Sequence, residues 1–144
     1  MTTTDIGALI AATAEQWIGT PFHWQAQVQG VGCDCKGLVA GVARDCGRAE
    51  ADELEALAAD YGPVVDIFRL RAGLNRLFDR AATVRAGDVL LVRIGGKPQH
   101  LAIAAPTRAR PSRAIQALDT GPREVIATGV PRALIAGIYR WKEG

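Results

Sequence analysis

The hydrophobic period of this sequence changes once along its 144 residues, near Gly87. Before Gly87, apolar side chains recur every three to four positions, which is the spacing of the buried stripe on an amphipathic helix. After Gly87, they alternate with polar residues or run together in short segments, which is typical of strands. Helices followed by strands predict an α+β fold, with N-terminal helices packed on a C-terminal antiparallel sheet. We expect residues 1–144 to form one domain.

The first part of the chain predicts four helices. The first begins after a cap at Thr4 or Asp5 and ends at Gly19-Thr20-Pro21. Its apolar stripe consists of Ile6, Leu9, Ile10, Thr13 and Trp17. A third helix is expected over the acidic, alanine-rich residues 50–60, and a fourth has Pro63 in its first turn. The apolar stripe of this fourth helix consists of Val64, Ile67, Phe68, Leu74, Leu77 and Phe78.

The second helix follows a loop over residues 22–32 and carries a cysteine in its first turn. Asp34 is a suitable N-cap for this helix, and Gly47 suits the position just beyond its C-terminus. Helical spacing places five side chains on one face, namely Cys35, Leu38, Val39, Val42 and Cys46. Cys35 therefore points toward the core.

The second part of the chain predicts strands over residues 88–94, 99–105, 113–118, 124–127 and 135–141. A turn at Gly95-Gly96-Lys97-Pro98 joins the first two. Alternation places His100, Ala102 and Ala104 on one face of the second strand. Because the two alanines are small, we expect the first turn of the Cys35 helix to occupy the space beside His100.

Cys35 and His100 are the residue types of a thiol nucleophile and its base. A thiol attacks a carbonyl only as the thiolate, and an ordinary cysteine, with a pKa of about 8.5, is mostly protonated at neutral pH. The start of a helix and an adjacent imidazolium each lower that pKa. A third polar side chain must hold the far nitrogen of the imidazole. Gln116, on a strand expected to pair with that of His100, suits this role, and Asp119 is the alternative.

The three cysteines favour neither a disulfide framework nor a metal site. Cys33, Cys35 and Cys46 are an odd number, and the first two are too close in sequence to bridge easily. Free thiols in a reducing compartment fit better. No Cys-x-x-Cys pair occurs, and helical rise separates Cys35 from Cys46 by roughly 16 Å. We therefore expect no bound metal ion and no other cofactor.

Composition argues against several partners. A net charge of +2 is too small to indicate nucleic acid or a membrane surface. No apolar run approaches the roughly 18 residues of a membrane span. The N-terminus, Met-Thr-Thr-Thr-Asp, lacks the basic and apolar regions of a signal peptide. We expect the chain to be made in the cytoplasm, so that something else must carry it to any substrate outside.

Several segments form one recognisable pattern. Gly19-Thr20-Pro21-Phe22 is followed by residues 30–39, GVGCDCKGLV. Gly87-Asp88-Val89-Leu90-Leu91 precedes His100-Leu101-Ala102-Ile103, and Ala114-Ile115-Gln116-Ala117 and residues 135–140 complete the series. This pattern resembles the NlpC family of papain-like cysteine peptidases, above all the branch found in phage tails and gene transfer agents. The match covers nearly the whole chain.

The resemblance implies a papain-like NlpC fold and hydrolysis of peptidoglycan stem peptides, usually between the γ-carboxyl of D-Glu and a diamino acid. It implies Cys35 as nucleophile, His100 as base and Gln116 as orienting residue. The residues implied for substrate binding are Asp34, Phe22, Trp24 and Lys36; Asp34 aligns with a family Asp associated with the substrate's free amine. The branch implies a tail-tip or baseplate hub as partner, location on a virion or tail particle, and action in the cell wall or periplasm.

Two departures from the family pattern leave alternatives open. Phe22 stands where many relatives have Tyr, and Lys36 replaces a frequent Ser. The missing hydroxyl motivates one alternative, a weakly active or inactive wall-binding module of a tail tip or baseplate. Another keeps the thiol mechanism but changes the reaction to amide cleavage at a different bond or to acyl transfer.

Overall fold

A computed structural model describes residues 5–59 and 66–143. In this part of the chain the helices are α1 (Ile6–Glu15), α2 (Cys35–Asp45), α3 (Ala51–Ala59) and α4 (Ile67–Leu77). A short hairpin of β1 (Gln27–Val28) and β2 (Gly32–Cys33) precedes α2. The later strands are β3 (Phe78–Arg80), β4 (Val89–Ile94), β5 (Lys97–Ala104), β6 (Arg113–Ala117), β7 (Val125–Gly129) and β8 (Ile135–Trp141), with a 3-10 turn, η1 (Arg132–Leu134), before β8. None of the described helices is long and apolar enough to cross a membrane.

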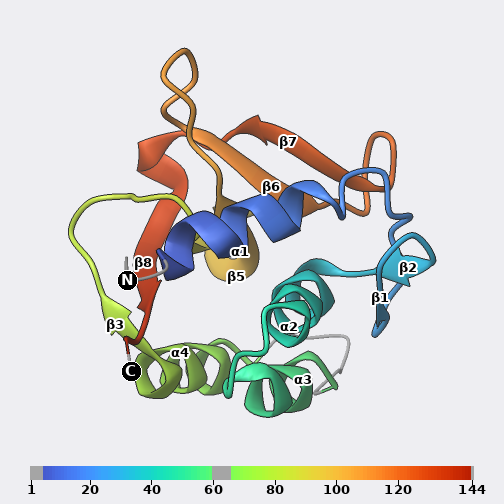
Figure 1. Ribbon diagram of the computed structural model, residues 1–144, viewed down its shortest axis with the longest axis horizontal. Helices are drawn as coiled ribbons and strands as arrows, with labels where there is room; N and C mark the ends of the chain where they lie inside the picture. The colour runs from blue at the N-terminus through green and yellow to red at the C-terminus, as the bar shows by residue number, and fades with distance from the viewer. Residues whose placement is uncertain (1–4, 60–65, 144) are drawn as a thin grey trace.

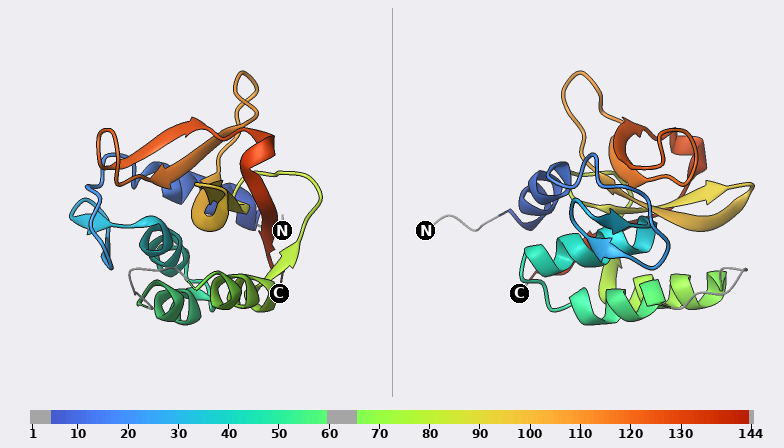
Figure 2. Two further views of the ribbon diagram at one scale, coloured as in Figure 1. Left: turned by 180° about the vertical axis from the view of Figure 1, so that it is seen from behind. Right: turned by 90° about the vertical axis from the view of Figure 1, so that its right-hand side faces the viewer.

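Strands β3 to β8 form one antiparallel sheet in the order β3-β8-β4-β5-β6-β7. β6 and β7 lie at one end of the molecule, α3 and α4 at the other, and α2 between them (Figures 1 and 2). The larger core cluster joins the helices to one face of the sheet, and it contains Leu38 and Val42 of α2 with Leu101 and Ile103 of β5. Helices packed on an antiparallel sheet confirm the predicted α+β class.

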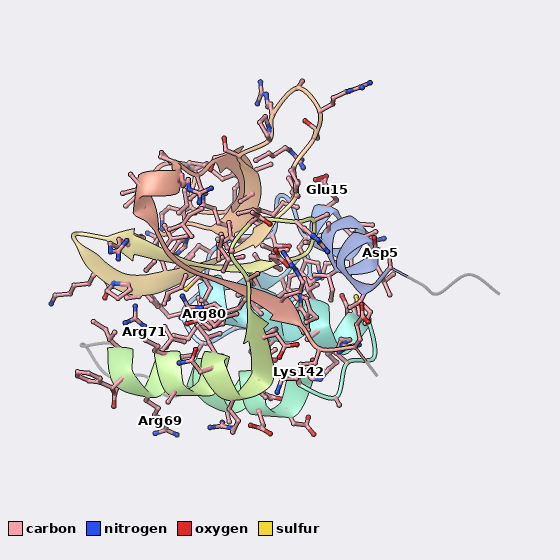
Figure 3. The ribbon with its side chains drawn as sticks, turned by 90° about the vertical axis from the view of Figure 1, so that its left-hand side faces the viewer. Asp5, Glu15, Arg69, Arg71, Arg80 and Lys142 are labelled. Carbon is pink, nitrogen blue, oxygen red and sulfur yellow. The ribbon has the colours of Figure 1, made fainter. Side chains whose placement is uncertain are left out.

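Helix α1 begins where the sequence predicts. Oδ1 of its cap, Asp5, accepts the Ala8 N–H at 3.1 Å. The helix ends at Glu15, earlier than expected, and Arg113 of β6 donates to Glu15 at 3.1 Å. Figure 3 labels Asp5 and Glu15, the cap and the last residue of this helix. The prediction for Leu9 was wrong, because this side chain is 43% exposed; the buried stripe is centred on Ile10, about 100° further round the helix.

Helix α4 begins at Ile67, because Oδ1 of Asp66 caps it by accepting the Arg69 N–H at 3.0 Å. The predicted Pro63 and Val64 lie outside the described residues. Phe68 was wrongly predicted as core, since it is 89% exposed. It precedes Leu70 by two residues, or about 200° of helical turn, and therefore faces away from the buried stripe. Phe78, expected in the helix, instead begins strand β3.

The five predicted strands are present; the bounds of 135–141 agree with the prediction, and those of the other four differ by one or two residues. Gly95 and Gly96 have φ values of 60° and 79°, as in a type I′ turn, so β5 starts at Lys97 directly after the turn. The strands that the sequence analysis missed are β1, β2 and β3. Each has only two or three residues, which is too short for an alternating pattern to appear.

The first turn of α2 lies beside His100 as predicted, because Cys35 is hydrogen-bonded to that imidazole, but Ala102 and Ala104 are not what makes room for the helix. Ala102 and Ala104 pack in a second cluster on the other face of the sheet, made of Leu90, Val92, Ala102, Ala104, Ala114 and Val130. The body of α2 packs on the opposite face, in the cluster of Leu101 and Ile103. The reason is that both faces of β5 are buried, and register shifts in β4 add to the bending of the sheet. Ala102 and Ala104 therefore pack against residues of neighbouring strands, on the face of the sheet away from the body of α2, and do not make room for the helix.

Candidate active site

Cys35 is the first residue of α2, and Asp34 determines where this helix begins. Oδ1 of Asp34 accepts the Gly37 N–H at 2.7 Å, as an N-cap does. Oδ2 accepts the Gln25 N–H, also at 2.7 Å, so the same carboxylate holds the preceding loop. Burial raises the pKa of Asp34, opposed by the N–H groups of Gly37 and Gln25.

The thiol of Cys35 is hydrogen-bonded to the imidazole of His100, and the backbone N–H of Leu101 donates to the same sulfur. On the other side of the ring, Nε2 of His100 lies 2.8 Å from Oε1 of Gln116. Since Nε2 faces Gln116, Nδ1 is the nitrogen available to Cys35. The three residues that the sequence singles out for catalysis thus form one hydrogen-bonded series.

The pairing of β5 with β6 explains why Gln116 reaches His100. The two strands run antiparallel, with Ala104 opposite Ala114. Alternate residues of a strand share a face, so His100 and Gln116 are diagonal neighbours on the same face of the sheet. The prediction that these two strands pair is confirmed.

The surroundings of Cys35 and His100 favour a thiolate beside an imidazolium. Burial raises the pKa of the Cys35 thiol, but the hydrogen bond and charge of His100 and the N–H of Leu101 lower it below the usual value overall. Burial lowers the pKa of His100, but hydrogen bonds to Cys35 and Gln116 and the charge of Asp119 raise it overall. Because each group stabilises the ionised form of the other, the pair titrates as a unit.

Gln116 has a further partner, Thr128 on β7. Nε2 of Gln116 donates to Oγ1 of Thr128 at 2.5 Å, and this hydroxyl donates to the Gly129 carbonyl at 3.4 Å. The sequence analysis missed Thr128, because the predicted strand 124–127 stops one residue short of it. The sequence does contain an indication of this position, because threonine is β-branched and residues of that type next to a strand often extend it.

A cavity of about 270 Å³ opens over Cys35 and His100. Phe22 and Trp24 line it with their rings edge to face, 4.9 Å between centroids, and Trp24 is 58% exposed. Lys36, which follows Cys35, also lines the cavity. Three of the four residues predicted for substrate binding therefore border the space next to the thiol.

Two acidic residues occupy different positions near this cavity. Asp34, the fourth residue predicted for substrate binding, is fully buried behind the helix start and does not belong to the lining of the cavity. Asp119, the alternative to Gln116, does line it, and its charge raises the pKa of His100. The hydrogen bond at Nε2 of His100, however, is made by Gln116.

The other cysteines are placed apart from this chemistry. Burial, with smaller contributions from the charges of Asp34 and Cys35, raises the pKa of Cys33 to about 12. The Cys46 thiol donates to Oγ1 of Thr13 at 3.3 Å. Within the described ranges, no three His, Cys, Asp or Glu side chains gather closely enough to hold a metal ion.

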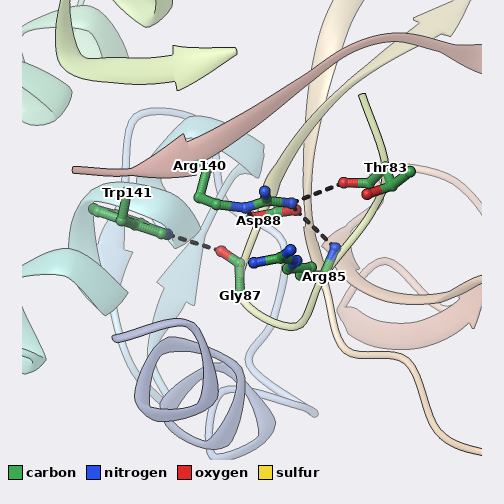
Figure 4. A network of polar contacts seen from close by, with 6 residues as sticks. All are labelled: Thr83, Arg85, Gly87, Asp88, Arg140 and Trp141. Atoms are coloured by element: carbon green, nitrogen blue, oxygen red, sulfur yellow. Dashed lines mark hydrogen bonds and ion pairs between the residues drawn. The ribbon is translucent and has the colours of Figure 1, made fainter. Parts of the chain in front are cut away.

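A larger cavity, of about 720 Å³, lies beside the first turn of α1 and is lined by Asp88 and Arg140 among others. Arg140 donates to both carboxylate oxygens of Asp88, at 3.1 and 2.8 Å, and Trp141 Nε1 donates to the Gly87 carbonyl at 2.8 Å (Figure 4). These contacts join the start of β4 to the end of β8. We interpret this network as structural, because Asp88 and Arg140 satisfy each other and neither a thiol nor an imidazole lines the cavity.

Comparison with known proteins identifies the fold. No family model matches the sequence, and no curated protein is similar enough to match. Among solved structures, the NlpC/p60 domain of the peptidoglycan hydrolase SagA is 24% identical with a TM-score of 0.58, over 94% of this chain and 98% of that domain. The P60 domain of an antigen from M. avium subspecies paratuberculosis is 16% identical, with a TM-score of 0.59 over 93% of both chains.

A third structure, NlpC1 from Trichomonas vaginalis, is 12% identical with a TM-score of 0.64; the match covers 98% of this chain but only 46% of that protein. Identities this low establish the fold alone. The chain has the NlpC/p60 fold, and the predicted papain-like NlpC architecture is confirmed.

Proposed function

We propose that this chain is a cysteine-type endopeptidase that hydrolyses peptidoglycan stem peptides. The observation that carries the proposal is the hydrogen-bonded series Cys35–His100–Gln116, whose thiol borders an open cavity. The fold supports the same conclusion, because a domain of the peptidoglycan hydrolase SagA shares it. Aromatic side chains beside the thiol supply a wall against which a peptide backbone packs.

In the proposed mechanism, His100 holds the proton that Cys35 has given up. The Cys35 thiolate attacks the carbonyl carbon of the scissile amide, and backbone N–H groups at the start of α2 stabilise the oxyanion. His100 protonates the leaving amine as the C–N bond breaks, which leaves a thioester on Cys35. Water, deprotonated by His100, then hydrolyses the thioester and regenerates the thiolate–imidazolium pair.

The bond that we propose is the one between the γ-carboxyl of D-Glu and a diamino acid. This assignment rests on the resemblance of residues 30–39 to the NlpC motif. We also propose that the substrate-binding residues are Phe22, Trp24 and Lys36, which line the cavity, with Asp34 acting at the helix start.

The decisive test is a digestion assay. Purified sacculi are incubated with wild type, Cys35→Ala and His100→Ala, and released muropeptides are identified by mass spectrometry. We expect γ-D-Glu–diamino acid cleavage by the wild type and none by either variant. Cleavage by Cys35→Ala at the wild-type rate would refute the mechanism.

For delivery, we propose that the chain rides on a phage-tail or gene-transfer-agent-like particle and acts in the cell wall or periplasm. A tail-tip or baseplate hub is the proposed partner, with neither nucleic acid nor membrane involved. The support for this is the branch of the family that the motifs resemble. Release of an internally accumulated enzyme at lysis is the alternative route, and immunodetection of the chain on purified particles distinguishes the two.

One observation favours a second candidate function. Phe22 lines the cavity without the hydroxyl that many relatives carry at this position, which fits a weakly active or inactive wall-binding module. The digestion assay separates the candidates, because such a module binds sacculi and releases no products. The mass of any product also labels the bond broken, so it tests the amidase and acyl-transfer alternatives in the same experiment.

A further inference from the structure

The hydrogen-bonded series at the active site continues past Gln116 to β7. Oγ1 of Thr128 accepts the Nε2 hydrogen of Gln116 at 2.5 Å, and the Thr128 hydroxyl donates to the carbonyl of Gly129 at 3.4 Å. The chain of contacts therefore runs from the Cys35 thiol through His100 and Gln116 to a backbone carbonyl. In each of these hydrogen bonds one group donates the hydrogen and the other accepts it, and these roles can be reversed where a group is able to do both.

The direction matters because a glutamine amide has two unlike ends. Its oxygen only accepts hydrogen bonds, whereas its nitrogen only donates them. An imidazolium carries hydrogen on both ring nitrogens, so the oxygen end stabilises it at Nε2 and the nitrogen end repels it. A Gln116 amide turned by 180° would oppose the ion pair of Cys35 and His100.

Thr128 selects between these two orientations. A hydroxyl is both donor and acceptor, so on its own it would accept either end of the amide. The Gly129 carbonyl takes the hydroxyl hydrogen, which leaves the lone pairs of Oγ1 for a donor. The nitrogen end of Gln116 then faces Thr128, and the oxygen end faces His100.

We propose that Thr128 is a positioning residue that holds the Gln116 amide with its oxygen toward His100, and thereby maintains the Cys35 thiolate and His100 imidazolium. The proposal rests on the proposed function only in taking Cys35 as the nucleophile. It does not depend on the substrate. Thr128 touches neither the thiol nor the imidazole, so its effect passes through Gln116.

The test measures the reactivity of the Cys35 thiol, which requires no substrate. Wild type, Thr128→Val and Thr128→Ser are alkylated with iodoacetamide across a range of pH, and the modified cysteine is identified by peptide mass spectrometry. Valine keeps the shape and strand propensity of threonine but lacks the hydroxyl, whereas serine keeps the hydroxyl. The other titratable groups near the pair, which are Cys33, Asp34, Lys36 and Asp119, are the same in all three proteins.

We expect Thr128→Val to move the midpoint of Cys35 alkylation to higher pH and to slow alkylation below that midpoint by about threefold to tenfold, the usual effect of losing one supporting hydrogen bond. Thr128→Ser restores the wild-type profile. In a Gln116→Ala background, Thr128→Val has no further effect on alkylation, because the amide through which Thr128 acts on His100 is absent. A merely structural role predicts a lower thermal midpoint with an unchanged alkylation profile.

The inference is overturned if Thr128→Val has the wild-type alkylation midpoint, or if its effect is undiminished in the Gln116→Ala background. It fails separately from the proposed function. Wild-type protein that is alkylated at Cys35 with this dependence on Thr128, yet releases no muropeptides, refutes the proposed substrate and leaves the positioning role in place.

Discussion

The indole ring of Trp17 lies directly against the backbone of Gly41 in α2. A Cβ atom built on Gly41 would be 2.2 Å from the ring, closer than two such atoms approach in proteins. Trp17 Nε1 also donates to Oδ2 of Asp45, one turn further along the same helix, at 3.0 Å. The turn after α1 and the middle of α2 are therefore held together by both shape and a hydrogen bond.

Gly41→Ala is expected to destabilise the protein by about 1–3 kcal/mol, because the added methyl group overpacks the contact with Trp17. Urea unfolding followed by circular dichroism measures this loss. Combining the substitution with Trp17→Phe, which removes the outer indole ring atoms, supplies the control. Part of the loss from Gly41→Ala should disappear in the Trp17→Phe background, and full additivity would argue against a clash with the ring.

Reactivity of the thiol and hydrolysis should depend differently on pH. The pKa of Cys35 is lowered below its usual value and that of His100 is raised above its usual value. The thiolate–imidazolium pair is therefore the main form at pH values between these two pKa values. Alkylation of Cys35 should rise with pH through its lowered pKa and then stay high. Hydrolysis should rise over the same range but fall again as His100 deprotonates, since the leaving amine then lacks its acid. A hydrolysis profile that stays flat at high pH contradicts the acid role of His100.

Gln116→Ala should lower kcat/KM for stem-peptide cleavage by about tenfold to a hundredfold, the range for losing a hydrogen bond to a charged group. Gln116→Glu should instead shift the alkaline limb of the pH profile upward, because a carboxylate stabilises the imidazolium more strongly. Asp119→Asn serves as the comparison. A larger loss from Asp119→Asn than from Gln116→Ala would assign the orienting role to Asp119.

Arg140→Met should cost about 1–3 kcal/mol of stability, since the buried carboxylate of Asp88 loses its charged partner and keeps the Arg85 N–H. Asp88→Asn combined with Arg140→Met should recover part of this loss. The variants are compared by thermal unfolding. Because this pair lies outside the cavity over Cys35, the folded fraction of each variant should alkylate at Cys35 like the wild type.

The elements that local chemistry determines could be predicted from the sequence. Asp34 and Gly47 bound α2 as predicted, and the alternation after Gly87 located the main strands. The errors arose where tertiary contacts decide. Phe68 has the apolar character of a core residue but faces outward, because α4 packs on the core through Leu70, Leu74 and Leu77.

The contacts of the candidate site were predictable only in part. Helical spacing placed Cys35 at a helix start, and the strand pattern brought His100 near Gln116. No sequence period shows that both faces of β5 are buried, so the expectation that Ala102 and Ala104 make room for α2 was wrong. Thr128 was missed because the predicted strand stopped at residue 127, whereas β7, paired with β6, continues to Gly129.

The two hydrogen bonds accepted by Asp34 have a consequence for how substrate preference changes. One oxygen accepts the Gly37 N–H in the helical turn that carries the Cys35 sulfur, and the other accepts the Gln25 N–H in the segment that carries Trp24. Widening the mouth of the cavity by shifting that segment therefore also displaces the sulfur. New specificity is more readily obtained by exchanging side chains at Trp24 or Lys36 than by remodelling the backbone between them.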